Sequence, residues 1–195
     1  MKLDKKATLA KSTKHRLLFS GFVFASLFGT LGIIDGSFNS SAGGLDFQWD
    51  PDPNFVRLKE YQTSNERMER STYYFYIRSK ERKTGILKLS INVPDYFKAK
   101  ITADKLNLCH VKIGGFDSRT KCKEDIPAIF EVNKSQTAID IYPDTPIPVD
   151  KKNYAIVMQI KNPRKRGMFQ FNGYAQSPGA MPISSYMGTW SFDVK

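Results

Sequence analysis

The chain has 195 residues, of which 41% are hydrophobic, 13% aromatic and 25% charged. Aromatic side chains are plentiful and no heptad run of Ala, Leu, Glu and Lys occurs, which excludes a disordered chain and a coiled coil. The formal net charge is +11, and two cysteines and two histidines leave little material for a metal site. We therefore expect one globular domain, with or without a processed terminus.

The first 34 residues have the pattern of an export signal. Six of the first sixteen side chains are Lys or Arg, only Asp4 is acidic, and the run 17–34 that follows carries no charge. A basic head stays on the cytoplasmic side of a membrane while the apolar run enters the bilayer. We expect export to the periplasm, thylakoid lumen or cell envelope.

Removal of this signal is a separate question. The run 17–34 exceeds the ~7–15 residues usual for a cleaved apolar region and reaches the lower limit of a spanning helix. Gly, Ser and Thr dilute the run, however, and Ser40 and Ala42 place small residues at the minus-three and minus-one positions before Gly43. The pattern predicts a signal peptide over 1–42 with cleavage between Ala42 and Gly43. An uncleaved anchor, the one expected membrane contact of the chain, is the alternative.

Residues 43–70 form a predicted lead-in segment without a regular element. Its start is rich in Asp and Pro, and its end is polar. The acidic trio Asp46, Asp50 and Asp52 lacks the interleaved Gly and closing Glu of a calcium loop. We therefore expect a solvated loop there and predict no metal site.

From Ser71 onward the apolar pattern has period two, which is typical of strands with one buried face. The clearest runs are 87–93, 109–113, 139–141, 154–160 and 186–194, and shorter ones cover 73–77, 129–132 and 168–175. Only Pro94 to Lys105 could form a turn or two of helix. The pattern predicts an all-β fold over residues 71–195, an antiparallel β-sandwich of immunoglobulin-like architecture with an aromatic core.

Cys109 and Cys122 are expected to form a disulfide, because export places them in an oxidising compartment. A bridge that closes a loop of this length stabilises a fold by roughly 3 kcal/mol in the chain-entropy account. A reactive thiol is the alternative. It is disfavoured because His110 is the one histidine that remains after loss of the leader.

Three consecutive cations, Arg164, Lys165 and Arg166, are the candidate binding residues. They lie between two strand patterns, which predicts a hairpin tip. Phosphate, a sulfated or uronic-acid glycan, or anionic lipid headgroups would gain charge-assisted contacts there, and salt would weaken them. A solvated turn that improves solubility is the alternative. A second basic turn, with the same two interpretations, contains Arg78, Lys80, Arg82 and Lys83.

No catalytic residue and no cofactor is predicted. The chain offers no convincing Ser/His/Asp set, metal cluster or phosphate-binding glycine loop. The parity of His110 is opposite to that of Cys109, which predicts a solvated surface residue. Nucleic acid is not an expected partner, because export removes the usual target and no nucleic-acid-binding motif occurs. A glycan-active enzyme that uses Asp/Glu pairs stays open, because sequence does not give distances between carboxylates.

A series of short motifs follows in order along the chain: Phe55-Val56-Arg57-Leu58, Thr72-Tyr73-Tyr74-Phe75, Val93-Pro94, Pro146-Ile147-Pro148, Asn162-Pro163-Arg164, Gly167-Met168-Phe169, and Tyr186-Met187-Gly188 with Trp190 and Phe192. In this order they resemble the cyanobacterial exported proteins grouped as domain of unknown function 2808. The resemblance covers most of residues 43–195 and implies export, with no established activity and no catalytic residue. Lys165, Arg166 and the cysteine pair lie outside the pattern.

These observations favour a non-enzymatic binding or structural module of the cell envelope. An anionic glycan or lipid surface would contact it through Arg164, Lys165 and Arg166. An accessory subunit of a membrane complex is a further alternative, favoured if the N-terminal segment is retained. The sequence predicts no particular protein partner.

Overall fold

The computed structural model describes residues 54–179 and 183–195, which belong to the compact unit Trp49–Lys195. The export signal, its cleavage site at Ala42 and Gly43, and the acidic residues at 46, 50 and 52 lie outside the described residues. No helix in the described part is long and apolar enough to cross a membrane.

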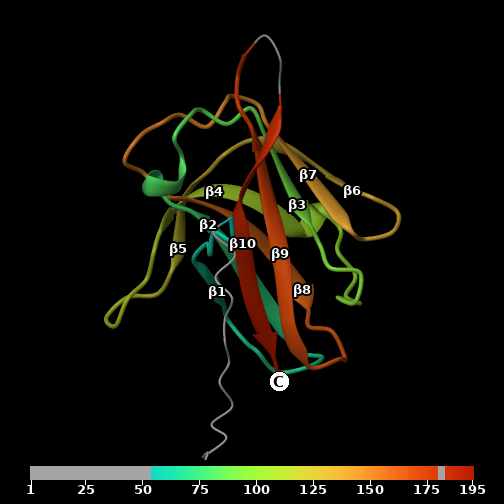
Figure 1. The fold of residues 1–195 in the computed structure, drawn as a ribbon. Coiled ribbons are helices and arrows are strands. Elements are labelled where there is room, and N and C mark those ends of the chain that lie inside the picture. Colours follow the sequence, from blue (N-terminus) through green and yellow to red (C-terminus); the bar gives the residue numbers. More distant parts are fainter. Residues whose placement is uncertain (1–53, 180–182) are drawn as a thin grey trace, which may run out of the picture. The chain divides into compact units, whose positions relative to one another are not determined.

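The described residues form two five-stranded sheets in which neighbouring strands are antiparallel (Figure 1). The first sheet contains, in spatial order, β1 (Glu60–Gln62), β2 (Arg70–Ile77), β8 (Tyr154–Lys161), β4 (Leu106–Lys112) and β5 (Lys121–Asp125). The second contains β10 (Ser184–Val194), β9 (Gly167–Gln176), β3 (Lys88–Asn92), β7 (Ala138–Pro143) and β6 (Ala128–Val132). The predicted all-β fold with two antiparallel sheets is confirmed.

An aromatic core holds the sheets together. The Phe75 ring of β2 lies edge-on to the rings of Phe171, Trp190 and Phe192, with centroids 5.3, 5.3 and 5.0 Å away. The indole Nε1 of Trp190 donates a hydrogen bond of 3.0 Å to the carbonyl oxygen of Tyr76. Such aromatic pairs contribute about 0.5–1.5 kcal/mol each beyond their buried area.

Part of the predicted lead-in belongs to the sandwich. The Leu58 N–H donates to the Thr189 carbonyl (2.9 Å) and the Thr189 N–H donates to the Val56 carbonyl (2.7 Å), so residues 56–58 lie parallel to β10. The chain then crosses to the first sheet and forms β1. The crossing is tight at Gly188, where φ is +149° and a Cβ would lie 2.6 Å from Leu58 Cγ. Glycine is required there on both grounds.

Residues 94–105, all of which the structure describes, contain no α-helix. The chain is mostly irregular and ends in one 3₁₀ turn, η2 (Ala103–Lys105). Phe97, Ala99 and Ile101 are buried at alternate positions, and the Phe97 ring packs 5.0 Å from that of Phe171. The turn or two of α-helix that the sequence allowed here is not formed, and residues 97, 99 and 101 instead enter the core at alternate positions.

Candidate functional site

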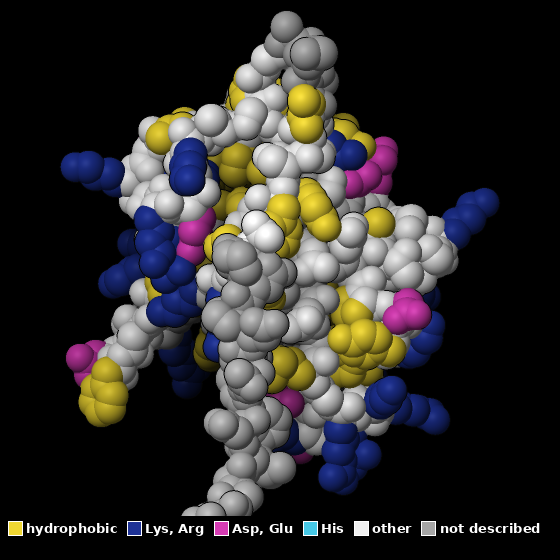
Figure 2. All heavy atoms as spheres, in the orientation of Figure 1, with side chains coloured by type: hydrophobic (Ala, Val, Ile, Leu, Met, Phe, Trp, Pro, Cys, Tyr) yellow, Lys and Arg dark blue, Asp and Glu magenta, His cyan; other side chains and the backbone are white. Residues whose placement is uncertain are grey.

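The three predicted binding residues lie in the turn between β8 and β9, and all are exposed. Figure 2 shows Lys and Arg side chains protruding at this turn, at the lower right of the view. The ammonium of Lys165 lies 5.9 Å above the ring of Tyr96. Arg164 lines a shallow surface pocket with Arg67 and Glu66.

A buried asparagine anchors the base of this turn. The Tyr73 hydroxyl donates to Asn162 Oδ1 (2.6 Å), and Asn162 Nδ2 donates to the carbonyl oxygens of Ser64 (3.1 Å) and Glu66 (2.7 Å). Burial raises the pKa of Tyr73, so this hydroxyl stays a donor throughout the physiological range. The basic turn is thereby fixed to the loop that precedes β2.

A basic pocket adjoins this turn: Lys161, the last residue of β8, lines the pocket and directly precedes Asn162. Its volume is about 500 Å³. It is lined by Arg70, Ser71, Thr72, Lys100, Thr102, Lys105, Gln159, Ile160 and Lys161. Four of these side chains are cations and none is a carboxylate. We call this site the basic pocket.

The strand register brings like charges together in the basic pocket. Arg70 of β2 lies directly opposite Lys161 of β8, and Thr72 lies opposite Gln159. Their side chains point away from the core, since the intervening Tyr73, Met158 and Ile160 are buried between the sheets. Like charges directly opposite each other destabilise an antiparallel pair. The arrangement therefore costs stability unless an anion neutralises it.

One carboxylate stands beside the basic pocket. Asp104 lies 3.3 Å from the Lys105 ammonium. Hydrogen bonds from Thr102 and Lys105 lower the pKa of Asp104, so it is ionised at neutral pH. Among the described residues no ion pair is formed by the other three cations of the pocket. The pocket thus keeps a positive charge.

The sequence pattern did not reveal the basic pocket, because its cations come from three separate segments. Arg70 begins β2, Lys100 and Lys105 lie in the irregular segment before β4, and Lys161 ends β8. The one local signal is the position of Lys161, immediately before the motif that starts at Asn162. No periodicity in the sequence connects it with Arg70.

The second basic turn is not the exposed cluster expected from the sequence. Arg82 is only 4% exposed, and Arg78 forms an ion pair with Glu81. Lys80 and Lys83 alone of the four are exposed. Burial lowers the pKa of Arg82, and the charge of Asp150 opposes this shift. An anion-binding role for all four residues is therefore wrong, because two of them are bound within the fold.

The solvated position predicted for His110 is also wrong. His110 is half-buried, with its ring centroid 6.0 Å from that of Tyr154, in a small pocket that Glu124 and Lys152 also line. His110 does lie on the face opposite Cys109, as its parity predicted, but β4 is covered on both faces and so this face is not open to solvent. Leu108 packs in the main core, while Cys109 packs in a second cluster on the outer face of the sheet.

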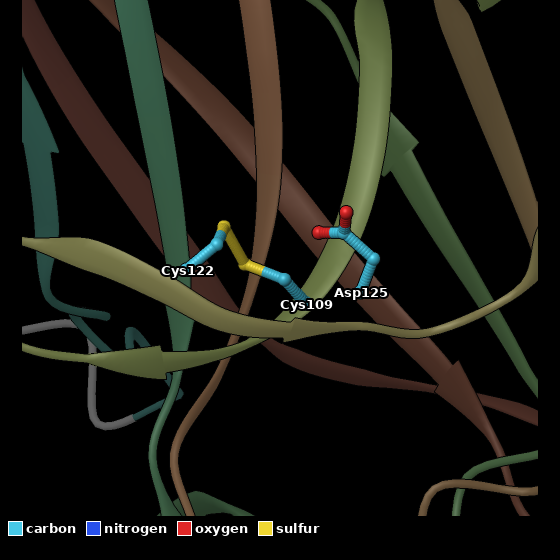
Figure 3. A group of neighbouring side chains, drawn as sticks. All are labelled: Cys109, Cys122 and Asp125. Carbon is cyan, nitrogen blue, oxygen red and sulfur yellow. A yellow bond between two sulfur atoms is a disulfide. The ribbon is translucent and has the colours of Figure 1, made fainter.

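Cys109 and Cys122 form a disulfide, as predicted, and it ties β4 to the edge strand β5. Their sulfur atoms and a carboxylate oxygen of Asp125 lie within 4.8 Å of one another (Figure 3). The sulfurs are bonded to each other, so neither is the thiolate that a metal requires. The Asp125 carboxylate accepts a hydrogen bond of 2.6 Å from Asn107. We assign this group a structural role.

Paired carboxylates, the basis of the enzyme alternative, do not line any of the three pockets described above; the pocket beside Arg164 has Glu66 alone. The basic pocket has none, and Glu124 is the single one in the pocket beside His110.

Several solved structures are similar to this chain. They include the collagen-binding domain of a Staphylococcus aureus adhesin, with 14% identity over 69% of this chain and 95% of that chain and a TM-score of 0.39. BslA, a bacterial hydrophobin, is 10% identical over 72% and 95% of the two chains, with a TM-score of 0.44. An uncharacterized Nocardia farcinica protein with an immunoglobulin-like fold is 11% identical over 71% and 97%, with a TM-score of 0.39. These similarities concern the fold alone.

Residues 48–194 match the family model described as "Protein of unknown function (DUF2808)". Among curated proteins, no match was found.

Proposed function

The chain belongs to the DUF2808 family, a family of unknown function, and we propose that it is a non-enzymatic binding module that holds the acidic groups of a ligand in the basic pocket. The supporting observation is the register of β2 and β8, which sets Arg70 opposite Lys161. A bound carboxylate, sulfate or phosphate between them would convert a repulsive pair into two charge-assisted contacts. Thr72, Thr102 and Gln159 would supply hydrogen bonds to the same group.

The exposed turn has a supporting role in this proposal. Arg164, Lys165 and Arg166 follow Lys161 on the same hairpin and extend the positive surface outward. Exposed cations attract an acidic ligand over a distance, and at 0.1 M salt this attraction is largely screened beyond about 10 Å. The turn would therefore govern the rate of association, while the basic pocket would govern how long the ligand stays.

Export belongs to the proposal as well. The basic and apolar leader over 1–42 and the disulfide both favour an oxidising compartment, such as the periplasm, the thylakoid lumen or the cell envelope. Intact mass of the native protein tests the predicted cut between Ala42 and Gly43. An accessory subunit of a membrane complex remains the alternative if the leader is retained.

Thermal unfolding in sodium sulfate and in sodium chloride at equal ionic strength tests the pocket. Sulfate stabilises folded proteins in general, so the comparison is made between variants. The double variant Arg70→Ser/Lys161→Ser should be more stable than wild type in chloride by about 0.5–1 kcal/mol, because the repulsion is gone. It should lose the additional stabilisation that a bound anion gives the wild type.

The matched control is Lys83→Ser/Lys134→Ser, which removes the same charge from exposed positions outside the basic pocket. It should respond to sulfate as the wild type does. An equal sulfate response in all three proteins would refute the proposed function.

A further inference from the structure

We infer that the ligand of the basic pocket is an acidic polysaccharide, whose chain lies along the outer face of the first sheet and stacks on Tyr61 and Tyr74. This inference rests on the proposed function and adds the class of ligand. It comes from a row of tyrosines that continues the basic pocket along β2 and that an isolated anion would leave unused.

The tyrosine row consists of Tyr61, Tyr74 and Tyr76. Tyr61 of β1 is the cross-strand partner of Tyr74, with ring centroids 5.8 Å apart, and the ring of Tyr76 is stacked 6.3 Å from that of Tyr74. Tyr61 is 44% exposed, which is high for an aromatic side chain in a strand. Its ring is available for contact on the outside of the sheet.

The tyrosine row and the basic pocket share one strand face. Tyr74, Thr72 and Arg70 are alternate residues of β2 and therefore project from the same side of the sheet. At about 3.3 Å per residue, Tyr74 and Arg70 are separated by roughly 13 Å along the strand. A linear ligand along β2 would therefore meet a flat aromatic surface first and two cations at its end.

The far end of the tyrosine row is closed. The Tyr76 hydroxyl is hydrogen-bonded to Thr120 Oγ1 (2.6 Å), and Tyr76 is only 1% exposed. Thr120 belongs to the loop 113–120, which the disulfide holds close to β4. The loop thus forms one boundary of the surface, and the basic pocket forms the other.

A polysaccharide matches this surface better than a free anion or a lipid headgroup. A sugar ring has one apolar face and a rim of hydroxyls, which suits the flat ring and polar end of an exposed tyrosine. Uronate or sulfate groups would contact Arg70 and Lys161. A free anion would contact only these cations. A bilayer would need an apolar group to insert, and the fully exposed Phe116 at the tip of the loop 113–120 is the residue that reports this outcome.

Isothermal titration calorimetry with polygalacturonate, dextran sulfate and neutral dextran tests the inference. We expect both acidic polymers to bind and neutral dextran not to bind. Tyr61→Ala should weaken binding of the acidic polymers about tenfold, and Tyr61→Phe should retain most of it because the stacking face is kept. The control Tyr186→Ala removes an exposed ring from the second sheet and should bind as the wild type does. Each variant is first shown to be folded by circular dichroism.

Failure of the inference and failure of the proposed function have different signatures. If Tyr61→Ala binds both polymers like wild type while Arg70→Ser/Lys161→Ser does not bind, the tyrosine row is not a polysaccharide site and the proposed function stands. If neither polymer binds, the inference is wrong and the sulfate experiment alone decides the function. If phosphatidylglycerol vesicles bind, the polymers do not, and Phe116→Ser abolishes vesicle binding, the ligand is a membrane and the inference is wrong.

Discussion

The guanidinium of Arg82 lies 2.6 Å from the Oδ1 atom of Asp150, whose side chain is 28% exposed, and this ion pair joins the segment after β2 to the segment before β8. The Arg82 side chain has no exposed surface. It also donates hydrogen bonds to the main-chain carbonyls of Ile77, Pro148, Asp150 and Lys152. One side chain therefore links the end of β2 to the segment 148–152 through four carbonyl groups.

Replacement of Arg82 should unfold this end of the molecule first. Arg82→Met keeps most of the side-chain volume but removes the donor to the buried Ile77 carbonyl, to three partly buried carbonyls and to Asp150 Oδ1. We expect a loss of about 2–3 kcal/mol in the free energy of unfolding, measured by urea denaturation, because hydrogen bonds from a buried charged donor are lost. Lys80→Met, at an exposed position in the same basic turn, should change stability by less than about 0.5 kcal/mol. Equal effects of the two substitutions would contradict this role of Arg82.

Asp150 should contribute to stability at neutral pH and lose that contribution in acid. Burial alone would raise its pKa, but the hydrogen bonds from Tyr154 and Lys152 and the charge of Arg82 outweigh burial and lower it. A carboxyl group whose pKa is lower in the folded state stabilises the fold above its unfolded pKa of ~3.9, and the stability is lost as the pH falls through the folded value. Asp150→Asn should therefore flatten the decline in stability below about pH 4. If the free energy of unfolding of the variant declined below pH 4 as steeply as that of the wild type, the prediction would be contradicted.

Tyr154 should affect stability at alkaline pH, the opposite end of the pH range. Burial, followed by the hydrogen bond and charge of Asp150, raises the pKa of Tyr154 to about 12. The folded state therefore favours the neutral phenol. This contribution to the free energy of unfolding is lost as the pH rises from the unfolded pKa of ~10 to the folded pKa of about 12. Tyr154→Phe removes the titrating group and should make unfolding less dependent on pH between about 10 and 12. The measurement is Tm across this range, with Tyr61→Phe as the exposed control.

Gly173 is expected to tolerate no side chain. A Cβ at this position would lie 2.5 Å from the Cζ3 atom of Trp190. Gly173→Ala must therefore displace the indole ring, at a cost of about 1–3 kcal/mol. Gly115→Ala, where no heavy atom lies within 4 Å of the added Cβ, is the matched control. In a double-mutant cycle, Trp190→Phe should reduce the cost of Gly173→Ala, and strict additivity would show that the two residues do not clash.

Loss of the disulfide should loosen the outer face of the first sheet. The Cys109–Cys122 bridge spans a sequence separation of 13 residues, and a loop of this size accounts for roughly 3 kcal/mol in the chain-entropy account. Cys109→Ala/Cys122→Ala should lower the free energy of unfolding by about that amount. Amide exchange should increase first in the loop 113–120, which is held to the sheet by the Tyr76–Thr120 hydrogen bond. Unchanged exchange in this loop would show that other contacts hold it.

The strand pattern was predictable where one face of a strand is buried and the other is not. In β3, Leu89 and Ile91 are buried and their neighbours are not, so a two-residue period gives both the element and its orientation. In β4 the cluster with Cys109 covers the outer face while Leu108 packs in the main core, so the correct parity of His110 led to a wrong prediction of its exposure. β1 has three residues, too few to produce a period.

The candidate site was predictable only where its residues are consecutive. Arg164, Lys165 and Arg166 form a charge run that any reading of the sequence detects. Arg70 and Lys161 are brought together by strand pairing across ninety residues of chain, and no local pattern encodes their register. Arg82 shows the reverse error: the sequence placed it in an exposed basic turn, but it is buried. A basic residue among basic neighbours gives no local indication of the carbonyl groups that will surround it.

The short parallel stretch at residues 56–58 also protects the protein from association. β10 is an eleven-residue strand at the margin of its sheet. An uncovered margin of this length offers a template to the backbone of another molecule. The hydrogen bonds between Thr189 and residues 56 and 58 pair some of the backbone N–H and C=O groups on this edge. A polypeptide that begins after Leu58 would lose these bonds together with the buried Leu58 side chain, and the part of β10 around Thr189 would become free to pair with another molecule.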